Sequence, residues 1–144
     1  MTLAAVDTNI LVYALLEQGP ERRRDIAQRL LLDLSSNSTC ILSTQVIKEF
    51  ANVATKKFTP RLTESVLTAH LEDLQQFNVI VVDSALVRAG VRRHFASQLN
   101  FYDALIVEAA IAGGAEVLYS EDMQHGVKFG KLRVVNPFLG EDQF

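Results

Sequence analysis

Four acidic side chains stand where a carboxylate could do chemistry. Asp7 ends the first apolar run of the chain, Asp122 follows a late one, and Glu49 and Asp103 lie within the first turns of two apolar helical patterns. Carboxylate oxygens suit a hard divalent cation such as Mg²⁺ or Mn²⁺, whereas a tetrahedral Zn²⁺ site is built on Cys and His. Such ions activate water and neutralise developing negative charge, so metal-assisted chemistry is the kind to consider.

The chain between these acids alternates between two kinds of pattern. Short apolar runs without polar alternation predict buried strands at residues 3–6, 40–44, 79–82, 115–120 and 131–136. Apolar residues at helical spacing predict helices at residues 8–18, 20–34, 45–58, 61–77, 84–99 and 101–114. We expect residues 121–129 to form a loop or a single turn.

Several helix boundaries carry recognisable signals. Ser43 or Thr44 can cap the third predicted helix, and Asp83 can cap the fifth. Thr59-Pro60 is typical of a helix opening, and Gly113-Gly114 can supply the left-handed turn that closes the last helix. That last helix is apolar on nearly all sides, which predicts that it is buried.

Strands that alternate with helices predict an α/β fold, with a mainly parallel sheet of about five strands covered by helices on both faces. In such a sheet the strand-to-helix loops gather at the carboxyl ends of the strands, where ligands bind. Asp7, Glu49, Asp103 and Asp122 are all predicted to reach this edge from separate segments. We therefore expect one shared site.

Grouping four carboxylates costs energy, because like charges a few ångström apart repel by roughly 1–4 kcal/mol per pair at surface-like dielectric. The acids must raise one another's pKa or bind a cation. Simpler explanations exist for each: Asp7 and Asp122 could cap helical turns, Asp103 could interact with a helix dipole, and Glu49 could be solvated or paired with a lysine. A shared metal site accounts for all four together.

The composition sets limits on the protein's size and partners. The chain has 144 residues, 49% of them hydrophobic, which is enough for one core. A net charge of -3 provides no global positive field, so a polyanion must be bound locally or through metal. The lone Cys40, the lack of a basic leader and the lack of a membrane-length apolar run predict a cytoplasmic protein without a signal peptide.

Four segments in order carry a family resemblance: VDTNILVYA (6–14), QVIKEFANV (45–53), FYDALIVEAA (101–110) and LYSEDMQHG (118–126). Together they resemble the four acidic motifs of PIN-domain ribonucleases, in particular the VapC-type toxins of bacterial toxin–antitoxin pairs. The match covers essentially the whole chain, so residues 1–144 would form a single PIN-like nuclease domain. The resemblance implies a three-layer α/β/α sandwich, metal-dependent RNA cleavage, homodimers and inhibition by a small antitoxin protein.

The same resemblance assigns roles to particular residues. Four positions match the family's metal-binding carboxylates, which would hold one or two Mg²⁺ or Mn²⁺ ions: Asp7, Glu49, Asp103 and Asp122. Asn9 and Ser120 match the polar positions of the first and fourth motifs, where they would orient carboxylates or water. Glu121 has no equally firm counterpart, and we interpret it as solvated or supporting.

Basic and aromatic residues are the natural candidates for RNA contacts. The basic candidates are residues 22–24, Lys56, Lys57, Arg61, Arg88, Arg92 and Arg93. A run of charges is more often a solvated helix face than a nucleic-acid site. Tyr13 and Tyr102 adjoin acidic motifs and could stack on a base, although an aromatic residue beside a core usually packs.

Three other functions were weighed against the ribonuclease. A phosphohydrolase acting on a small phosphate ester also places a carboxylate after its first strand, but Asn9 stands where enzymes of the haloacid-dehalogenase type usually carry a second Asp. A receiver-like signalling module would need a Lys after a late strand, and VVNPF offers none. A catalytically silent PIN-like binding module is disfavoured because all four acids are present.

Overall fold

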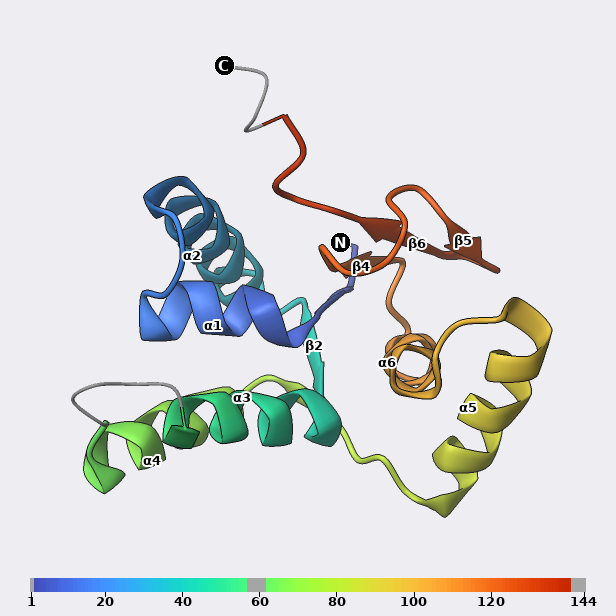
Figure 1. The fold of residues 1–144 in the computed structure, drawn as a ribbon, viewed down its shortest axis with the longest axis horizontal. Coiled ribbons are helices and arrows are strands. Elements are labelled where there is room, and N and C mark those ends of the chain that lie inside the picture. The colour runs from blue at the N-terminus through green and yellow to red at the C-terminus, as the bar shows by residue number, and fades with distance from the viewer. Residues whose placement is uncertain (1, 57–61, 141–144) are drawn as a thin grey trace.

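A six-stranded sheet divides the molecule into layers (Figure 1). The computed structural model describes residues 2–56 and 62–140. The strands are β1 (Ala4–Val6), β2 (Cys40–Ser43), β3 (Asn78–Ile80), β4 (Val117–Tyr119), β5 (Lys128–Phe129) and β6 (Leu132–Val135). They lie in the order β3-β2-β1-β4-β6-β5, and all neighbouring pairs are parallel except β5 with β6. The predicted mainly parallel α/β architecture is confirmed.

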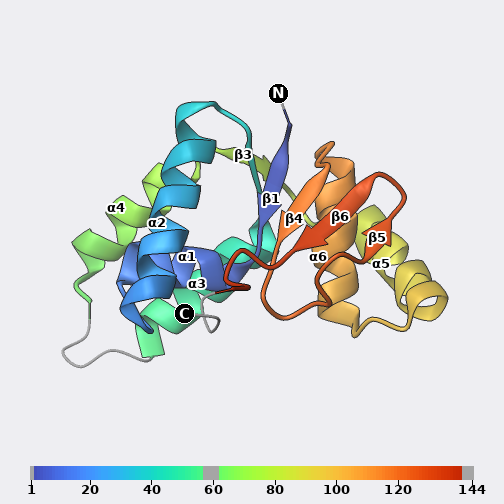
Figure 2. The ribbon, with the colours of Figure 1, turned by 90° about the horizontal axis from the view of Figure 1, so that it is seen from above.

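Helices cover both faces of the sheet. They are α1 (Thr8–Leu16), α2 (Glu21–Ser36), α3 (Thr44–Lys56), α4 (Glu64–Leu74), α5 (Ser84–Ser97) and α6 (Phe101–Ala112). Figure 2 shows α1 to α4 on one side of the strands and α5 and α6 on the other. The molecule is therefore the predicted three-layer α/β/α sandwich. Within the ranges described above, no helix is long and apolar enough to cross a membrane.

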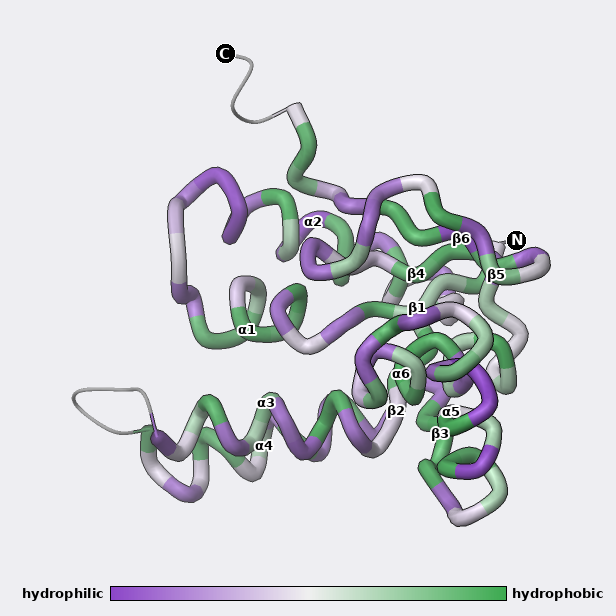
Figure 3. Tube along the Cα trace, turned by 45° about the vertical axis from the view of Figure 1, so that its right-hand side comes forward, coloured by the Kyte–Doolittle hydropathy of each residue, from purple (hydrophilic) through white to green (hydrophobic). Residues whose placement is uncertain are grey.

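The core follows the apolar pattern of the sequence. Every residue of β1 and β2 is buried, as expected for strands covered on both faces. Hydrophobic residues also make up most of α1 and α6, and α1 and the central strands are coloured largely as hydrophobic in Figure 3. Since α1 packs between α2 and α3, it buries several sides at once and holds the loop after β1 in place.

The caps of the helices agree with the sequence signals. The Ser43 hydroxyl accepts from the Val46 N–H at 3.2 Å, and the Asp83 carboxylate accepts from the Leu86 N–H at 2.9 Å. The predicted helix opening at Thr59-Pro60 lies outside the described residues, and the described part of that segment is capped by Thr63.

The two glycines after α6 play different roles. Gly114 adopts a left-handed backbone with φ of 83°, as predicted, whereas Gly113 does not. A Cβ on Gly113 would lie 2.8 Å from Cγ2 of Ile41 in β2. Gly113 is therefore needed for close packing of α6 on the sheet, so only half of the predicted left-handed pair was right.

Two strand predictions need correction. Within the described residues the sheet has six strands instead of about five, since residues 128–129, predicted as loop, pair antiparallel with Leu132 and Arg133 of β6. Gly130 has φ of 62° and starts the two-residue turn between them, and strands this short show no periodic pattern. The third strand lies at 78–80 instead of 79–82, because Val82 leaves the ladder and donates its N–H to Thr44 Oγ1 at 3.1 Å.

Candidate functional site

The candidate site lies beside β1, at the point where the strand order of the sheet reverses. From β1 the chain passes through α1 and α2 to β2 on one side, whereas β4 pairs with β1 on the other side. Val6 and Tyr119 are register partners, so Asp7 and Ser120 leave adjacent parallel strands at the same edge. Such a switch point at the carboxyl ends of the strands is where α/β sheets bind ligands.

Asp7 is buried, with an exposed fraction of 4%. One carboxylate oxygen accepts from the Thr8 N–H at 2.7 Å, and the other accepts from the Ser120 hydroxyl at 2.8 Å. Burial raises the pKa of Asp7 to about 6, although these two hydrogen bonds act to lower it, and the charges of Asp122 and Glu49 raise it further. The helix-capping role and a role in a shared site are thus both compatible with its position.

Glu49 extends from α3 toward the start of α1. Its Oε2 accepts from the Thr8 hydroxyl at 2.6 Å, and its Oε1 accepts from the Gln45 amide at 3.1 Å. Gln45 also donates to the backbone carbonyl of Tyr102 at 3.2 Å, which ties α3 to α6. The carboxylate is therefore held by neutral donors, and the described contacts give it no lysine partner.

Asp103 projects from the first turn of α6. Asn100 caps this helix: its Oδ1 accepts from the Asp103 N–H at 2.8 Å, and its Nδ2 donates to the Asp103 carboxylate at 2.9 Å. Burial raises the pKa of Asp103, and the charges of Asp122 and Glu49 add to the rise. The helix itself is placed by close packing on α5, where a Cβ on Gly90 would approach Leu105 to 2.6 Å.

Asp122 is exposed in the loop after β4. The Ser120 hydroxyl, which donates to Asp7, accepts from the Asp122 N–H at 3.2 Å. Ser120 is completely buried and links the first and fourth motifs. Partial burial of its carboxyl group raises the pKa of Asp122, and the charges of Glu121 and Glu49 add to the rise. Asn9 donates to Asp122 over a longer 3.4 Å.

Glu121 is not solvated. Its side chain is 13% exposed, and its carboxylate forms a 2.7 Å ion pair with Arg23 of α2. The same carboxylate accepts from the Tyr13 hydroxyl at 2.6 Å and from the Asn9 amide at 2.9 Å. Of the two interpretations offered above, the supporting role stands and the solvated one is wrong.

Burial raises the pKa values of Asp7, Asp103 and Asp122, and the charge of Glu49 adds to each of these shifts. All four carboxylates also accept hydrogen bonds from side chains of the described residues. Among residues 2–56 and 62–140, no three His, Cys, Asp or Glu side chains are arranged to hold an ion together. The donor set is nevertheless the all-oxygen set that hard divalent ions prefer, so its chemistry fits Mg²⁺ or Mn²⁺.

The basic and aromatic candidates divide into distinct groups. Arg23 is engaged with Glu121, and Arg93 pairs with Glu108 of α6 at 2.9 Å, so both have structural partners. Arg88 and Arg92 are exposed on α5, while Lys57 and Arg61 lie outside the described residues. Tyr13 packs edge-on against Phe138 at 5.3 Å between ring centroids. Tyr102, in contrast, is 65% exposed directly beside Asp103.

Sequence reasoning missed the donors that hold the acids. Thr8 bonds Asp7 and Glu49, Gln45 bonds Glu49, and Asn100 bonds Asp103. Arg23 pairs with Glu121, the acid next to the fourth carboxylate. Asn100 had a detectable signal, since it precedes an apolar helix by one residue and is a preferred cap. Arg23 had none, because its partner lies 98 residues away in the sequence.

Comparison with known proteins identifies the family. The family model of the PIN domain matches residues 4–128, and the chain belongs to the PIN-domain family. No curated protein matches the chain.

Solved structures with the same fold include a toxin–antitoxin complex from Klebsiella pneumoniae, with a TM-score of 0.68 and 22% identity over 93% of this chain and 97% of that one. VapBC2 from Rickettsia felis, bound to a promoter DNA fragment, has a TM-score of 0.63 and 21% identity over 92% and 97% of the two chains. The sarcin–ricin-loop-cleaving toxin VapC20 of Mycobacterium tuberculosis has a TM-score of 0.57 and 20% identity over 81% and 88%. At these identities the likeness concerns the fold.

Proposed function

We propose that the protein is a metal-dependent endoribonuclease that cleaves RNA phosphodiesters at the carboxyl edge of its sheet. The observation that carries this proposal is that Asp7 and the Asp122 loop leave adjacent parallel strands at the switch point of a PIN domain, where burial and the Glu49 charge raise the pKa values of Asp7, Asp103 and Asp122. Carboxylates kept together against their repulsion indicate a cationic ligand. An enzyme that only bound neutral small molecules would gain nothing from this arrangement.

In this proposal the four acids hold one or two Mg²⁺ or Mn²⁺ ions. Bound ions of this kind lower the pKa of water and neutralise charge on the phosphate and the leaving oxygen. The chain's own residues fix the acids: Ser120 and the Thr8 N–H hold Asp7, and Asn100 holds Asp103.

The partner of the protein is proposed from its structural relatives. The first two solved structures described above are a toxin–antitoxin complex and a VapBC complex, and VapC20 is a toxin that cleaves the sarcin–ricin loop. By analogy, this chain acts as the toxin of a toxin–antitoxin pair, forms a homodimer and is inhibited by a small antitoxin protein. These assignments rest on fold-level likeness, whereas the ribonuclease is argued from the site.

The direct test is cleavage of a pool of structured RNAs by the purified protein. We expect cutting in Mg²⁺ or Mn²⁺ that stops in EDTA and is absent in Asp103→Asn. Cutting that persists in EDTA and in the variant would come from a contaminant and would contradict the proposal. Hydrolysis of small phosphate esters without RNA cleavage would favour the phosphohydrolase, and metal binding without any hydrolysis would favour the silent module.

A further inference from the structure

A second cluster of side chains lies beside the four acids. It consists of Glu121 and the residues that donate hydrogen bonds to its carboxylate. All three of its partners come from the two helices that follow β1: Asn9 and Tyr13 from α1, and Arg23 from α2. Asn9 and Tyr13 are four residues apart and therefore share one face of α1. The two helices lie side by side in Figures 1 and 2, and Glu121 ties the loop after β4 to both of them.

The arginine of the cluster is fixed on several sides. Its guanidinium donates to Glu121 Oε2 at 2.7 Å, lies 3.4 Å from the Tyr13 hydroxyl and stacks over the ring of Phe138 at 5.5 Å. Phe138 is 3% exposed and meets Tyr13 edge to face. An ion pair supported by hydrogen bonds and a ring is geometrically defined, unlike most surface pairs.

Asn9 connects this cluster to the candidate metal ligands. Its Nδ2 donates to Glu121 at 2.9 Å and lies 3.4 Å from the Asp122 carboxylate. Asn9 is also two residues after Asp7, so one amide adjoins the first and fourth motifs. Glu121 is the nearer acceptor of this amide, and Arg23 and Tyr13 donate to the same carboxylate.

We propose that Arg23 and Glu121 are positioning residues of the ribonuclease, which fix the Asn9 amide between Glu121 and Asp122 and keep a fifth carboxylate out of the metal site. The inference rests on the proposed function. Without Arg23, the Glu121 charge would be left beside Asp122 with no ion-pair partner in this contact, and the carboxylate could turn toward the ions. Removal of Arg23 alone should therefore reduce ribonuclease activity more than removal of the Arg23 and Glu121 charges together.

The test compares Arg23→Ala, Glu121→Gln and the double variant with the wild type, using Arg29→Ala as the matched control. Arg29 is exposed on the same helix. Glu121→Gln retains an acceptor for Tyr13 and Asn9 without the charge. We expect kcat to fall at least tenfold in Arg23→Ala with little change in KM, to fall less than threefold in Glu121→Gln, and to return in the double variant to the level of Glu121→Gln.

A purely structural role gives a different pattern. The losses would multiply in the double variant and would follow the melting temperature, and Arg23→Lys would rescue activity only as far as it restored stability. That outcome, or full activity of Arg23→Ala, would overturn the positioning role. The Arg29→Ala control is expected to match the wild type in every measurement.

Calorimetric titration with Mn²⁺ separates this inference from the proposed function. The dissociation constant should change less than threefold in Glu121→Gln and at least tenfold in Asp122→Asn, since only the second is proposed as a ligand. Equal weakening in both would make Glu121 a ligand and would overturn the inference while leaving the ribonuclease intact. A wild type that neither binds Mn²⁺ nor cleaves RNA would overturn both.

Discussion

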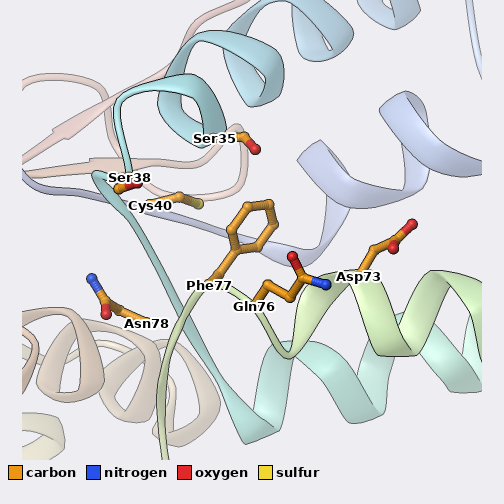
Figure 4. Close-up of a pocket in the computed structure, with 7 residues that line it drawn as sticks. All are labelled: Ser35, Ser38, Cys40, Asp73, Gln76, Phe77 and Asn78. Carbon is orange, nitrogen blue, oxygen red and sulfur yellow. The ribbon is translucent and has the colours of Figure 1, made fainter.

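The two edges of the sheet contrast in chemistry although the same strands build both. At the carboxyl edge, the loops after the strands bring acids together, and burial and repulsion raise the pKa values of Asp7, Asp103 and Asp122. At the amino edge lies a cavity of about 310 Å³ lined mostly by uncharged side chains (Figure 4). Its lining residues are Ser35, Ser38, Cys40, Asp73, Gln76, Phe77 and Asn78.

Helix direction explains much of this difference. The helices α1, α3 and α6 begin at the carboxyl edge, so their N-terminal N–H groups and partial positive charge favour carboxylates there. The helices α2 and α4 end at the amino edge. Cys40 lies at the same edge, and burial raises the pKa of its thiol to about 12. A cavity alone is therefore a poor guide to chemistry in this fold, whereas charge gathered at helix starts is a good one.

The largest expected effect is on RNA cleavage, which should depend on the acids of the carboxyl edge and not on the acid of the amino edge. Asp103→Asn and Asp122→Asn should each reduce RNA cleavage by about 100-fold or more, since loss of a proposed ligand exceeds the 10–100-fold cost of losing a group that only orients one. Asp73→Asn removes an acid at the amino edge and should leave cleavage unchanged. Rates in Mn²⁺ measured on one RNA substrate make the comparison. Equal losses of RNA cleavage at the two edges would contradict the contrast between them.

The sequence was sufficient for most of this architecture, but not for the contacts inside it. The apolar runs and caps predicted the three layers and the edge of the sheet that the acids occupy, because burial on both faces and helix capping are local signals. The β5–β6 hairpin escaped prediction because two-residue strands have no period. The Arg23–Glu121 pair escaped because only folding brings α2 to the loop after β4.

A second prediction concerns the stability of the metal-free protein. The pKa of Asp7 is about 6 in the folded chain, above the usual 3.8, so the folded state holds more protons between these values. The free energy of unfolding should therefore fall as pH rises from 4 to 6, by up to about 3 kcal/mol from this group. Asp7→Asn should be more stable than the wild type by up to that amount at pH 7.5.

Urea denaturation in EDTA at several pH values measures this difference. The advantage of Asp7→Asn should shrink as the pH falls below 6 and disappear below about pH 3, where Asp7 is protonated in both the folded and the unfolded state. An Asp73→Asn variant serves as the control at the amino edge. An Asp7→Asn variant that is less stable than the wild type at pH 7.5, by a margin that vanishes at low pH, would show that the charge stabilises the fold and would contradict this prediction.

Metal binding should offset the destabilisation that the buried Asp7 charge causes. With Mn²⁺ at about 100 times its dissociation constant, the wild type should gain about 2.7 kcal/mol and melt roughly 5–10 °C higher. EDTA should remove the gain, and Asp122→Asn should show little of it. Thermal denaturation followed by circular dichroism gives the shift, and an equal rise in Asp122→Asn would place the ion elsewhere.

The smallest effect is expected at the amino edge. Cys40→Ala should leave RNA cleavage within twofold of the wild type and lower the free energy of unfolding by about 1 kcal/mol, because it removes a buried sulfur next to the cavity. In the folded wild type the thiol should react slowly with iodoacetamide, since its raised pKa keeps it protonated. Rapid alkylation that abolishes cleavage would give this edge a function.

The central claim is that the four acids of the carboxyl edge together form one binding site for divalent metal. Calorimetric titration with Mn²⁺ tests it most directly when Asp7→Asn, Glu49→Gln, Asp103→Asn and Asp122→Asn are compared with Asp73→Asn. Our account predicts that each of the four weakens binding at least tenfold, while Asp73→Asn binds like the wild type. Wild-type affinity in Asp7→Asn and Asp103→Asn would contradict it.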